Sequence, residues 1–169
     1  MTQSRKVLAY EAIKQKIIRG ELTEGQPISE KEITEELSIS RTPLREALSM
    51  LEQEHLLEIH PKRGVFISRV TYKDINNIYS IRLILEPFAV RQAGPSLRRE
   101  DLLEQQRIWS EAPEHDTPVA HIERDTNLHN LITEATDNKY LMQFLKRLYD
   151  QARRIRFLSV RRNEDRQYE

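Results

Sequence analysis

The sequence predicts a mainly α-helical protein, in which a winged helix-turn-helix of three helices plus a β-hairpin is followed by an all-helical bundle. Three observations lead to this fold class. Apolar residues recur at helical spacing through most of the chain, and two short helical segments joined by a tight link occupy residues 29–51. A basic turn also separates two strand-like segments within residues 56–70.

The first two helices of the N-terminal part have clear boundaries. A helix is expected at residues 6–19, where apolar residues form one stripe and Gly20 marks the end. Residues 21–27 contain glycine and proline and are expected to form a loop. The second helix opens at Ser29, whose hydroxyl can accept a hydrogen bond from the amide of Glu32 in a capping box.

The third helix begins near Ser40 and Arg41, with Pro43 in its first turn, where a missing N–H is tolerated. Its expected core stripe consists of Leu44, Ala47, Leu48 and Leu51. Arg41 and Arg45 share a different face at the N-terminal end, where backbone amides and the helix dipole favour phosphate. A recognition helix carries its base-reading side chains there. The alternative for this arginine pair is an ordinary solvated helix face.

The third helix is followed by a predicted hairpin with strands at residues 56–60 and 65–70. Its turn consists of Pro61, Lys62, Arg63 and Gly64. Proline and glycine set the turn, while lysine and arginine place two charges at its tip. A basic turn beside a basic helix end offers two contacts to one DNA duplex, so the pattern predicts a DNA-binding wing.

Residues 6–70 resemble the GntR family of bacterial winged-helix regulators. The resemblance is carried by Ile28-Ser29-Glu30, by the segment from Ser40 to Leu48, and by Arg63-Gly64. It implies that Arg41 and Arg45 read guanines in the major groove, that Thr42 holds phosphate, and that Gly64 lets the wing backbone enter the minor groove. Lys31 stands where some relatives carry a DNA-contacting arginine, and a lysine there favours phosphate contact. The expected DNA-binding residues are Lys31, Ser40, Arg41, Thr42, Arg45, Lys62, Arg63 and Gly64.

Composition restricts the class of protein. The 169 residues carry 27 basic and 27 acidic side chains, so net charge alone does not indicate a nucleic-acid partner and the local basic groups must do so. No apolar run approaches the roughly 18 residues of a membrane-spanning helix, and no signal peptide is expected. The absence of cysteine excludes disulfides and thiol catalysis and fits a cytoplasmic location.

The second half is expected to form a separate helical domain, so that the domains are residues 1–70 and 71–169. Helices are predicted at residues 72–93, 99–110 and 118–135, and a last helix is capped by Asp137 or Asn138. The inward face of the first of these helices is expected to consist of Ile75, Ile78, Leu85 and Phe88. Pro87 is expected to kink this helix. Five arginines of the last helix are expected to lie on an exposed face, namely Arg153, Arg154, Arg156, Arg161 and Arg162.

Residues 72–158 resemble the FCD domain of FadR-type GntR regulators. The resemblance rests on Ile81-Arg82 with Leu85-Glu86, on Asp125 with His129, and on Asn138 with Leu141. It implies an effector-binding or dimerisation module, and an incomplete one. That module has about six helices and two further histidines on the later ones, whereas this sequence shows four and stops at Glu169. The aliphatics that later helices would cover are expected to be partly exposed, namely Leu128, Leu131, Leu148 and Ile155.

Asp125 and His129 lie on one helix face together with Ile122 and Ile132. One interpretation is a pair of ligands to zinc, manganese or nickel. The other is an aspartate and a histidine that are hydrogen-bonded to each other or half exposed at a helix edge. The resemblance to the FCD domain indicates that the pair descends from a metal site and so favours the first interpretation, metal ligation. The remaining histidines of this sequence, His115 and His121 among them, do not complete such a site. We therefore expect weak metal binding or none.

The sequence as a whole predicts a cytoplasmic, non-enzymatic transcription regulator, most simply a metabolite-responsive repressor. It would bind a short palindromic operator as a homodimer and sense a small carboxylate metabolite through Arg82, Asp125 and His129. Two alternatives stay open. One is a truncated chain that only dimerises or binds DNA, and the other is a metal-dependent enzyme that uses Asp125 and His129.

Overall fold

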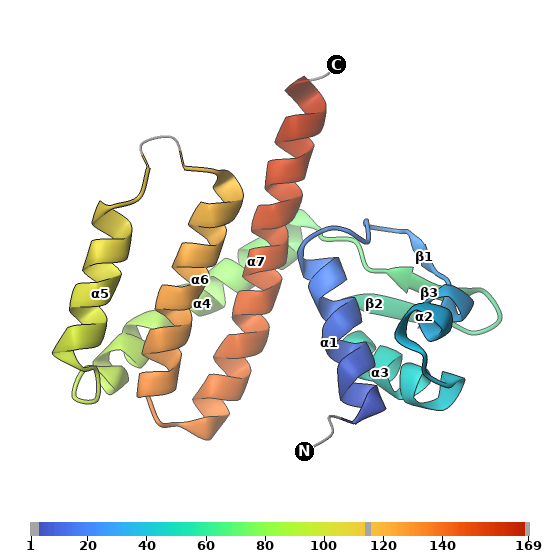
Figure 1. Cartoon of the computed structure of the whole chain (residues 1–169), viewed down its shortest axis with the longest axis horizontal. Coiled ribbons are helices and arrows are strands. Elements are labelled where there is room, and N and C mark those ends of the chain that lie inside the picture. Colours follow the sequence, from blue (N-terminus) through green and yellow to red (C-terminus); the bar gives the residue numbers. More distant parts are fainter. Residues whose placement is uncertain (1–3, 114–115, 168–169) are drawn as a thin grey trace. The chain divides into compact units, whose positions relative to one another are not determined.

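The computed structural model describes residues 4–113 and 116–167, with side chains to residue 162. The chain divides into two compact units, Met1–Thr71 and Tyr72–Glu169, and each is described by itself (Figure 1). No helix within the described residues combines the length and the apolar character needed to cross a membrane.

The first unit is a winged helix-turn-helix, as predicted. Its elements are α1 (Arg5–Ile18), β1 (Pro27–Ile28), α2 (Glu30–Leu37), α3 (Arg41–Gln53), β2 (Leu57–His60) and β3 (Gly64–Ile67). The strands form an antiparallel sheet in the order β1-β3-β2. The prediction of a loop throughout residues 21–27 was wrong at its end, because Pro27 pairs with Phe66. A two-residue strand has no periodicity of its own and exists only through this partner.

Local sequence explains how the helix pair forms. The Ser29 hydroxyl accepts a hydrogen bond from the Glu32 amide at 3.2 Å, which confirms the predicted cap of α2. Ser38 ends α2 with a left-handed backbone at φ +50°, and this conformation turns the chain into α3. Leu44, Ala47, Leu48 and Leu51 are all buried, as their spacing predicted, and they pack against α1 and the sheet.

One charged cluster also joins α1 to the end of α3. The Lys14 ammonium donates to Glu54 Oε2 at 2.7 Å and to the Tyr10 hydroxyl at 2.8 Å, while that hydroxyl donates to Glu54 Oε1 at 2.7 Å. The side chains of Lys14 and Glu54 are only 4% and 9% exposed. Burial raises the pKa of Tyr10 to about 12, so its hydroxyl remains a donor across the physiological range.

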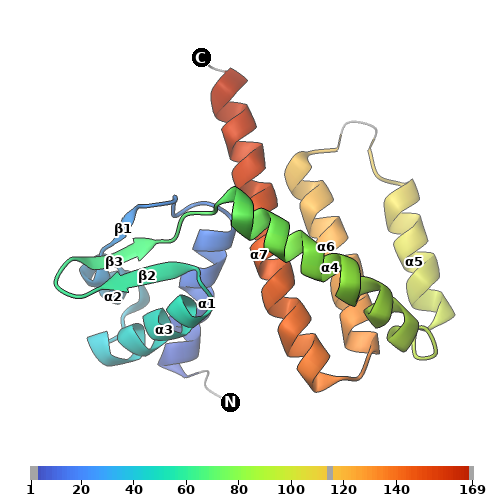
Figure 2. The same cartoon turned by 180° about the vertical axis from the view of Figure 1, so that it is seen from behind.

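The second unit is all helical, as predicted. It consists of α4 (Tyr72–Ala93), α5 (Arg99–Ser110), α6 (Pro118–Ala135) and α7 (Lys139–Gln167). α6 lies between α5 and α7, and α4 crosses the face of α6 and α7 (Figure 2). The core contains Ala89, Leu145, Leu148 and Tyr149.

Three expectations for the second unit were wrong. Phe88 is 44% exposed, because the inward stripe of α4 runs instead through Ile78, Leu85, Ala89 and Ala93, at the 3.6-residue period of a helix. Leu148 is buried in the core between α4, α6 and α7 and is not partly exposed. Arg154 is 2% exposed, so the arginines of α7 do not all share one solvated face.

Removing the Glu54 carboxylate is predicted to destabilise the first unit strongly. Glu54→Ala takes away the anion 2.7 Å from a nearly buried ammonium, which should lower the free energy of unfolding by on the order of 3 kcal/mol. Glu36→Ala is the matched control, because Glu36 pairs with Lys16 of the same helix α1 at the surface. Its expected cost is about 0–1 kcal/mol. Equal losses in denaturant unfolding of the two variants would contradict the prediction.

Candidate nucleic-acid interface and the cavity of the helical unit

The predicted base-reading residues lie exposed at the start of α3. The helix begins at Arg41, with Ser40 in the N-cap position, so Arg41, Thr42 and Arg45 occupy its first two turns. The buried stripe that starts at Leu44 turns the opposite side of the helix into the core, which leaves these polar side chains facing solvent. Amides at a helix N-terminus together with two guanidinium groups form a site suited to the phosphates and base edges of nucleic acid.

The wing tip is basic and exposed. Lys62 has a left-handed backbone at φ +64°, the Arg63 amide donates to the His60 carbonyl at 3.1 Å, and Gly64 lies at φ +104°. A Cβ on Gly64 would meet no atom within 4 Å, so the glycine is required by its backbone conformation and not by crowding within the chain. Among the described residues, no hydrogen bond or ion pair holds the side chains of Lys62 and Arg63.

Arg45 and Arg41 differ in a way that the sequence did not reveal. Arg45 Nε donates to Glu30 Oε2 at 3.1 Å, which links α3 to the first residue of α2. Arg41 has no such partner among the described residues. Lys31 is also exposed and lies 3.9 Å from Glu35 on the same helix. Glu30 belongs to the Ile28-Ser29-Glu30 motif, and that motif was the only sequence signal for its role.

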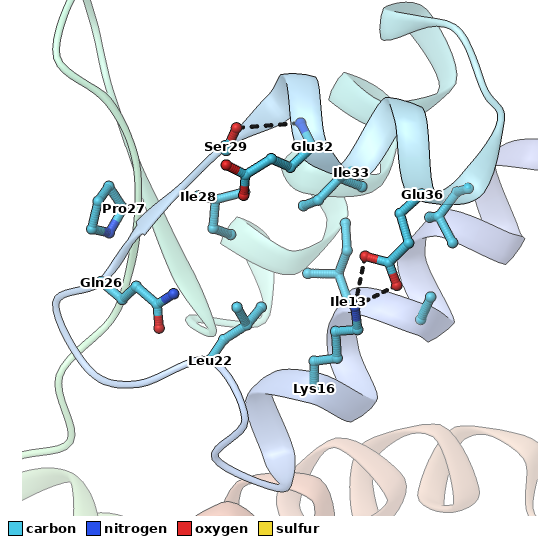
Figure 3. Close-up of a pocket in the computed structure, with 12 residues that line it drawn as sticks. Ile13, Lys16, Leu22, Gln26, Pro27, Ile28, Ser29, Glu32, Ile33 and Glu36 are labelled. Atoms are coloured by element: carbon cyan, nitrogen blue, oxygen red, sulfur yellow. Dashed lines mark hydrogen bonds and ion pairs between the residues drawn. The ribbon is translucent and has the colours of Figure 1, made fainter.

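A small groove of about 170 Å³ lies behind α2, between this helix, α1 and β1. Figure 3 shows Ser29 and Glu32 at one end and the ion pair of Lys16 with Glu36 at the other. Leu22, Ile28 and Ile33 line the space between them. The groove contains none of the predicted DNA-binding residues.

In the helical unit, the structure brings Arg82, Asp125 and His129 together. Arg82 Nη2 lies 3.3 Å from His129 Nε2, and Arg82 Nε donates to Glu86 at 2.6 Å. The imidazole packs on the ring of Tyr149, with 4.7 Å between centroids. Burial lowers the pKa of His129, so the ring is neutral at pH 7 and its free nitrogen can accept from the guanidinium.

Asp125 forms a close ion pair with Arg156 of α7, and its Oδ1 lies 3.7 Å from His129 Nε2. Each of the two predicted metal ligands therefore has a guanidinium beside it. A cation at this distance opposes the entry of a metal ion, and two ligands leave most coordination positions to water. No group of three or more histidine, cysteine, aspartate or glutamate side chains suited to a metal exists in the described part of the chain. The residues present do not fit a metal ion as they stand.

The space at these residues is small. The cavity lined by Arg82, Asp125, His129, Tyr149 and Arg156 has about 10 Å³, which is enough for one water molecule at most. A larger, open cavity of about 640 Å³ lies beside it, between the end of α5, the start of α6 and α7. Arg156 lines both cavities. The other lining residues of the larger cavity include Trp109, Asp116, His121, Arg124 and Val160.

His121 was expected to lie apart from the Asp125 and His129 pair. In the structure it packs edge-on against Trp109, with 5.3 Å between ring centroids, and it lines the larger cavity but not the small one at His129. His115 lies outside the described residues.

Comparison with known proteins identifies the class of this fold. Residues 6–67 match the model of the gntR family of bacterial regulatory proteins, and residues 77–168 match the model of the FCD domain. The chain therefore belongs to the GntR family of bacterial regulatory proteins and carries an FCD domain, as the two sequence resemblances predicted.

Individual relatives agree with this assignment. An uncharacterized HTH-type transcriptional regulator of Bacillus subtilis, YdhC, is 31% identical over 83% of this chain and 65% of its own length. The HTH-type transcriptional repressor RspR of Escherichia coli is 29% identical over 89% of this chain and 67% of its own length. The chain thus spans about two thirds of the length of these relatives.

Solved structures give the same fold. The E. coli protein McbR/YncC superposes with a TM-score of 0.75 at 25% identity, over 88% of this chain and 72% of that one. A GntR regulator structure from Rhodococcus has a TM-score of 0.68 at 21% identity, over 92% of this chain and 76% of that one. The second of these likenesses concerns the fold alone.

Replacing Gly64 is predicted to affect stability and DNA binding together. Gly64→Val places a β-branched residue at φ +104°, which should lower the free energy of unfolding by about 1–3 kcal/mol and deform the wing. Arg63→Ala is the control, because it removes a charge at the wing tip without changing the glycine. It should weaken DNA binding and leave the melting temperature unchanged. A Gly64→Val protein with unaltered melting temperature would contradict the backbone argument.

Proposed function

We propose that this chain is a DNA-binding transcription regulator that recognises a short two-fold symmetric operator. The observation that carries the proposal is that the basic N-terminal end of α3 and the basic wing tip are both exposed and belong to the same compact unit. Family membership supports it, and the name of the E. coli relative RspR favours repression as the outcome.

The proposed contacts divide by chemistry. Arg41 and Arg45 read base edges in the major groove, because a guanidinium can donate two hydrogen bonds to guanine. Lys31, Lys62 and Arg63 contact phosphate as charges, while the hydroxyls of Ser40 and Thr42 donate to phosphate oxygens. The backbone at Gly64 approaches the minor groove. Since the net charge of the chain is zero, these local groups supply the attraction to DNA.

We further propose that the regulator acts as a homodimer. A two-fold symmetric operator requires two recognition helices. An exposed apolar surface on α4 supports pairing, because Leu83 and Ile84 are 78% and 72% exposed and Phe88, one turn after Ile84, is 44% exposed. Since its target is bacterial DNA, the regulator works in the cytoplasm, and its action is binding and not catalysis.

The helical unit is proposed to sense a small carboxylate metabolite. Arg82 and Arg156 can pair with a carboxylate, and neutral His129 adds a polar group to the lining of the same space. Asp125 forms an ion pair with Arg156, so an incoming carboxylate would compete with Asp125 for the same guanidinium. The larger cavity beside Arg156 has the volume for a metabolite that the space at His129 lacks.

The recognition helix is tested by separating base contacts from phosphate contacts. Arg45→Ala should cost on the order of 1–3 kcal/mol of specific binding and relax the preference at one base pair. Lys62→Ala should weaken binding to every duplex alike and lower the salt dependence. Titrations against an operator and a scrambled duplex measure both effects. An unchanged ratio of affinities in Arg45→Ala would show that α3 does not read bases through this residue.

Metal binding by this chain is predicted to be weak or absent. Calorimetric titration with zinc, manganese and nickel at neutral pH should give no tight stoichiometric signal, because Asp125 and His129 each face an arginine. The control is a double variant, Asp125→Ala with His129→Ala, which should titrate like the unaltered chain. A tight signal that the double variant abolishes would show instead that these two residues anchor a working site.

A further inference from the structure

Glu30 lies where it can orient the Arg45 side chain and so influence how Arg45 contacts a DNA base. It occupies the first position of α2, and its Oε2 accepts from Arg45 Nε of α3 at 3.1 Å. The Arg45 side chain is 68% exposed and that of Glu30 is 30% exposed. A surface pair of this kind contributes little to folding, so its consequence concerns what Arg45 does in solution.

The contact uses one donor of Arg45 and leaves the others available. The guanidinium is a rigid plane with five N–H donors, and Glu30 engages the donor on Nε. No other hydrogen bond of this side chain exists among the described residues. The two terminal nitrogens therefore form a free edge, and this edge matches the O6 and N7 acceptors of guanine. A guanidinium group whose plane is already held in place loses less conformational freedom when it binds a base.

The same carboxylate also counteracts unselective binding. A negative charge beside Arg45 repels DNA phosphates, so the arginine gains less from a backbone contact than an unpaired arginine does. Arg41 has no carboxylate partner in the described part of the chain and keeps its full attraction to phosphate.

We propose that Glu30 is a positioning residue for sequence recognition, which orients Arg45 through Nε and presents its terminal edge to a guanine. The inference rests on the proposed function of α3 as a recognition helix. It adds a specificity determinant on α2, where the acceptor oxygen matters for orientation and the charge matters for discrimination against random DNA.

The test begins with a duplex that the unaltered chain enriches from a random library. Anisotropy titrations then give the ratio of affinities for this duplex and a scrambled one. Glu30→Ala should lower the ratio about tenfold, since it releases a base-reading arginine. Glu30→Gln should keep the ratio within about threefold, because its amide oxygen can still accept from Nε. Glu30→Asp keeps the charge at the helix start but reaches less far, and it should lose about fivefold.

Two controls isolate the contact. Glu46→Gln removes the same charge one residue from Arg45, but that carboxylate lies 3.7 Å from Lys6, so the ratio should stay unchanged. In an Arg45→Ala background, Glu30→Ala should cause no further loss, because the two residues act as one unit. Melting temperatures report whether each variant is folded.

Several results would overturn the inference. They are a Glu30→Ala ratio within about twofold of the unaltered chain, a Glu30→Gln loss as large as that of Glu30→Ala, or a further loss in the Arg45→Ala background. If the unaltered chain enriches no sequence, the proposed function fails and this inference falls with it. That case is distinct, because the failure is then seen before any variant is measured.

Discussion

Burial of one stripe of α3 is the constraint on which the DNA-facing surface depends. Leu44, Ala47, Leu48 and Leu51 are between 0% and 1% exposed. Because side chains three and four residues apart share a helix face, fixing this stripe against α1 and the sheet fixes the direction of every other side chain of α3. Arg41 and Arg45 face solvent as a consequence. The cluster of Lys14, Tyr10 and Glu54 adds a polar attachment at the other end of the same helix.

Electrostatic pairing distinguishes the candidate DNA-binding surface from the small cavity of the helical unit. In the first unit, Arg41 at the start of α3 and the two cations of the wing tip are exposed and have no hydrogen-bond or ion-pair partner among the described residues. Arg45 is the exception on this surface, because it pairs with Glu30. In the helical unit, Arg82, Arg153 and Arg156 are paired with carboxylates of α4 and α6 and are mostly sheltered from solvent. Cations that remain free suit an extended polyanion, whereas sheltered pairs suit exchange with a small anion.

This pairing changes the meaning of the histidine and aspartate on α6. Their spacing indicates only that they share a helix face, and both interpretations from the sequence begin there. Their neighbours weigh against a metal ion, because a guanidinium beside each group satisfies the aspartate and competes with a cation. The two groups are also 3.7 Å apart, which is too far for a direct hydrogen bond, so each is held mainly by its arginine.

The sequence by itself determined the winged helix-turn-helix, the four later helices and the exposed basic residues of α3 and the wing, because these follow from local periodicity, caps and turns. Ser29 caps α2 and Leu44 begins a buried stripe for reasons that lie within a few neighbouring residues. Only the tertiary structure decided that Pro27 joins the sheet, that Ala89 replaces Phe88 on the inward face of α4, and that Glu30 holds Arg45. Pro27 and Glu30 depend on partners that are distant in the sequence. Ala89 depends on which side of α4 packs against the other helices. Local spacing does not encode either kind of contact.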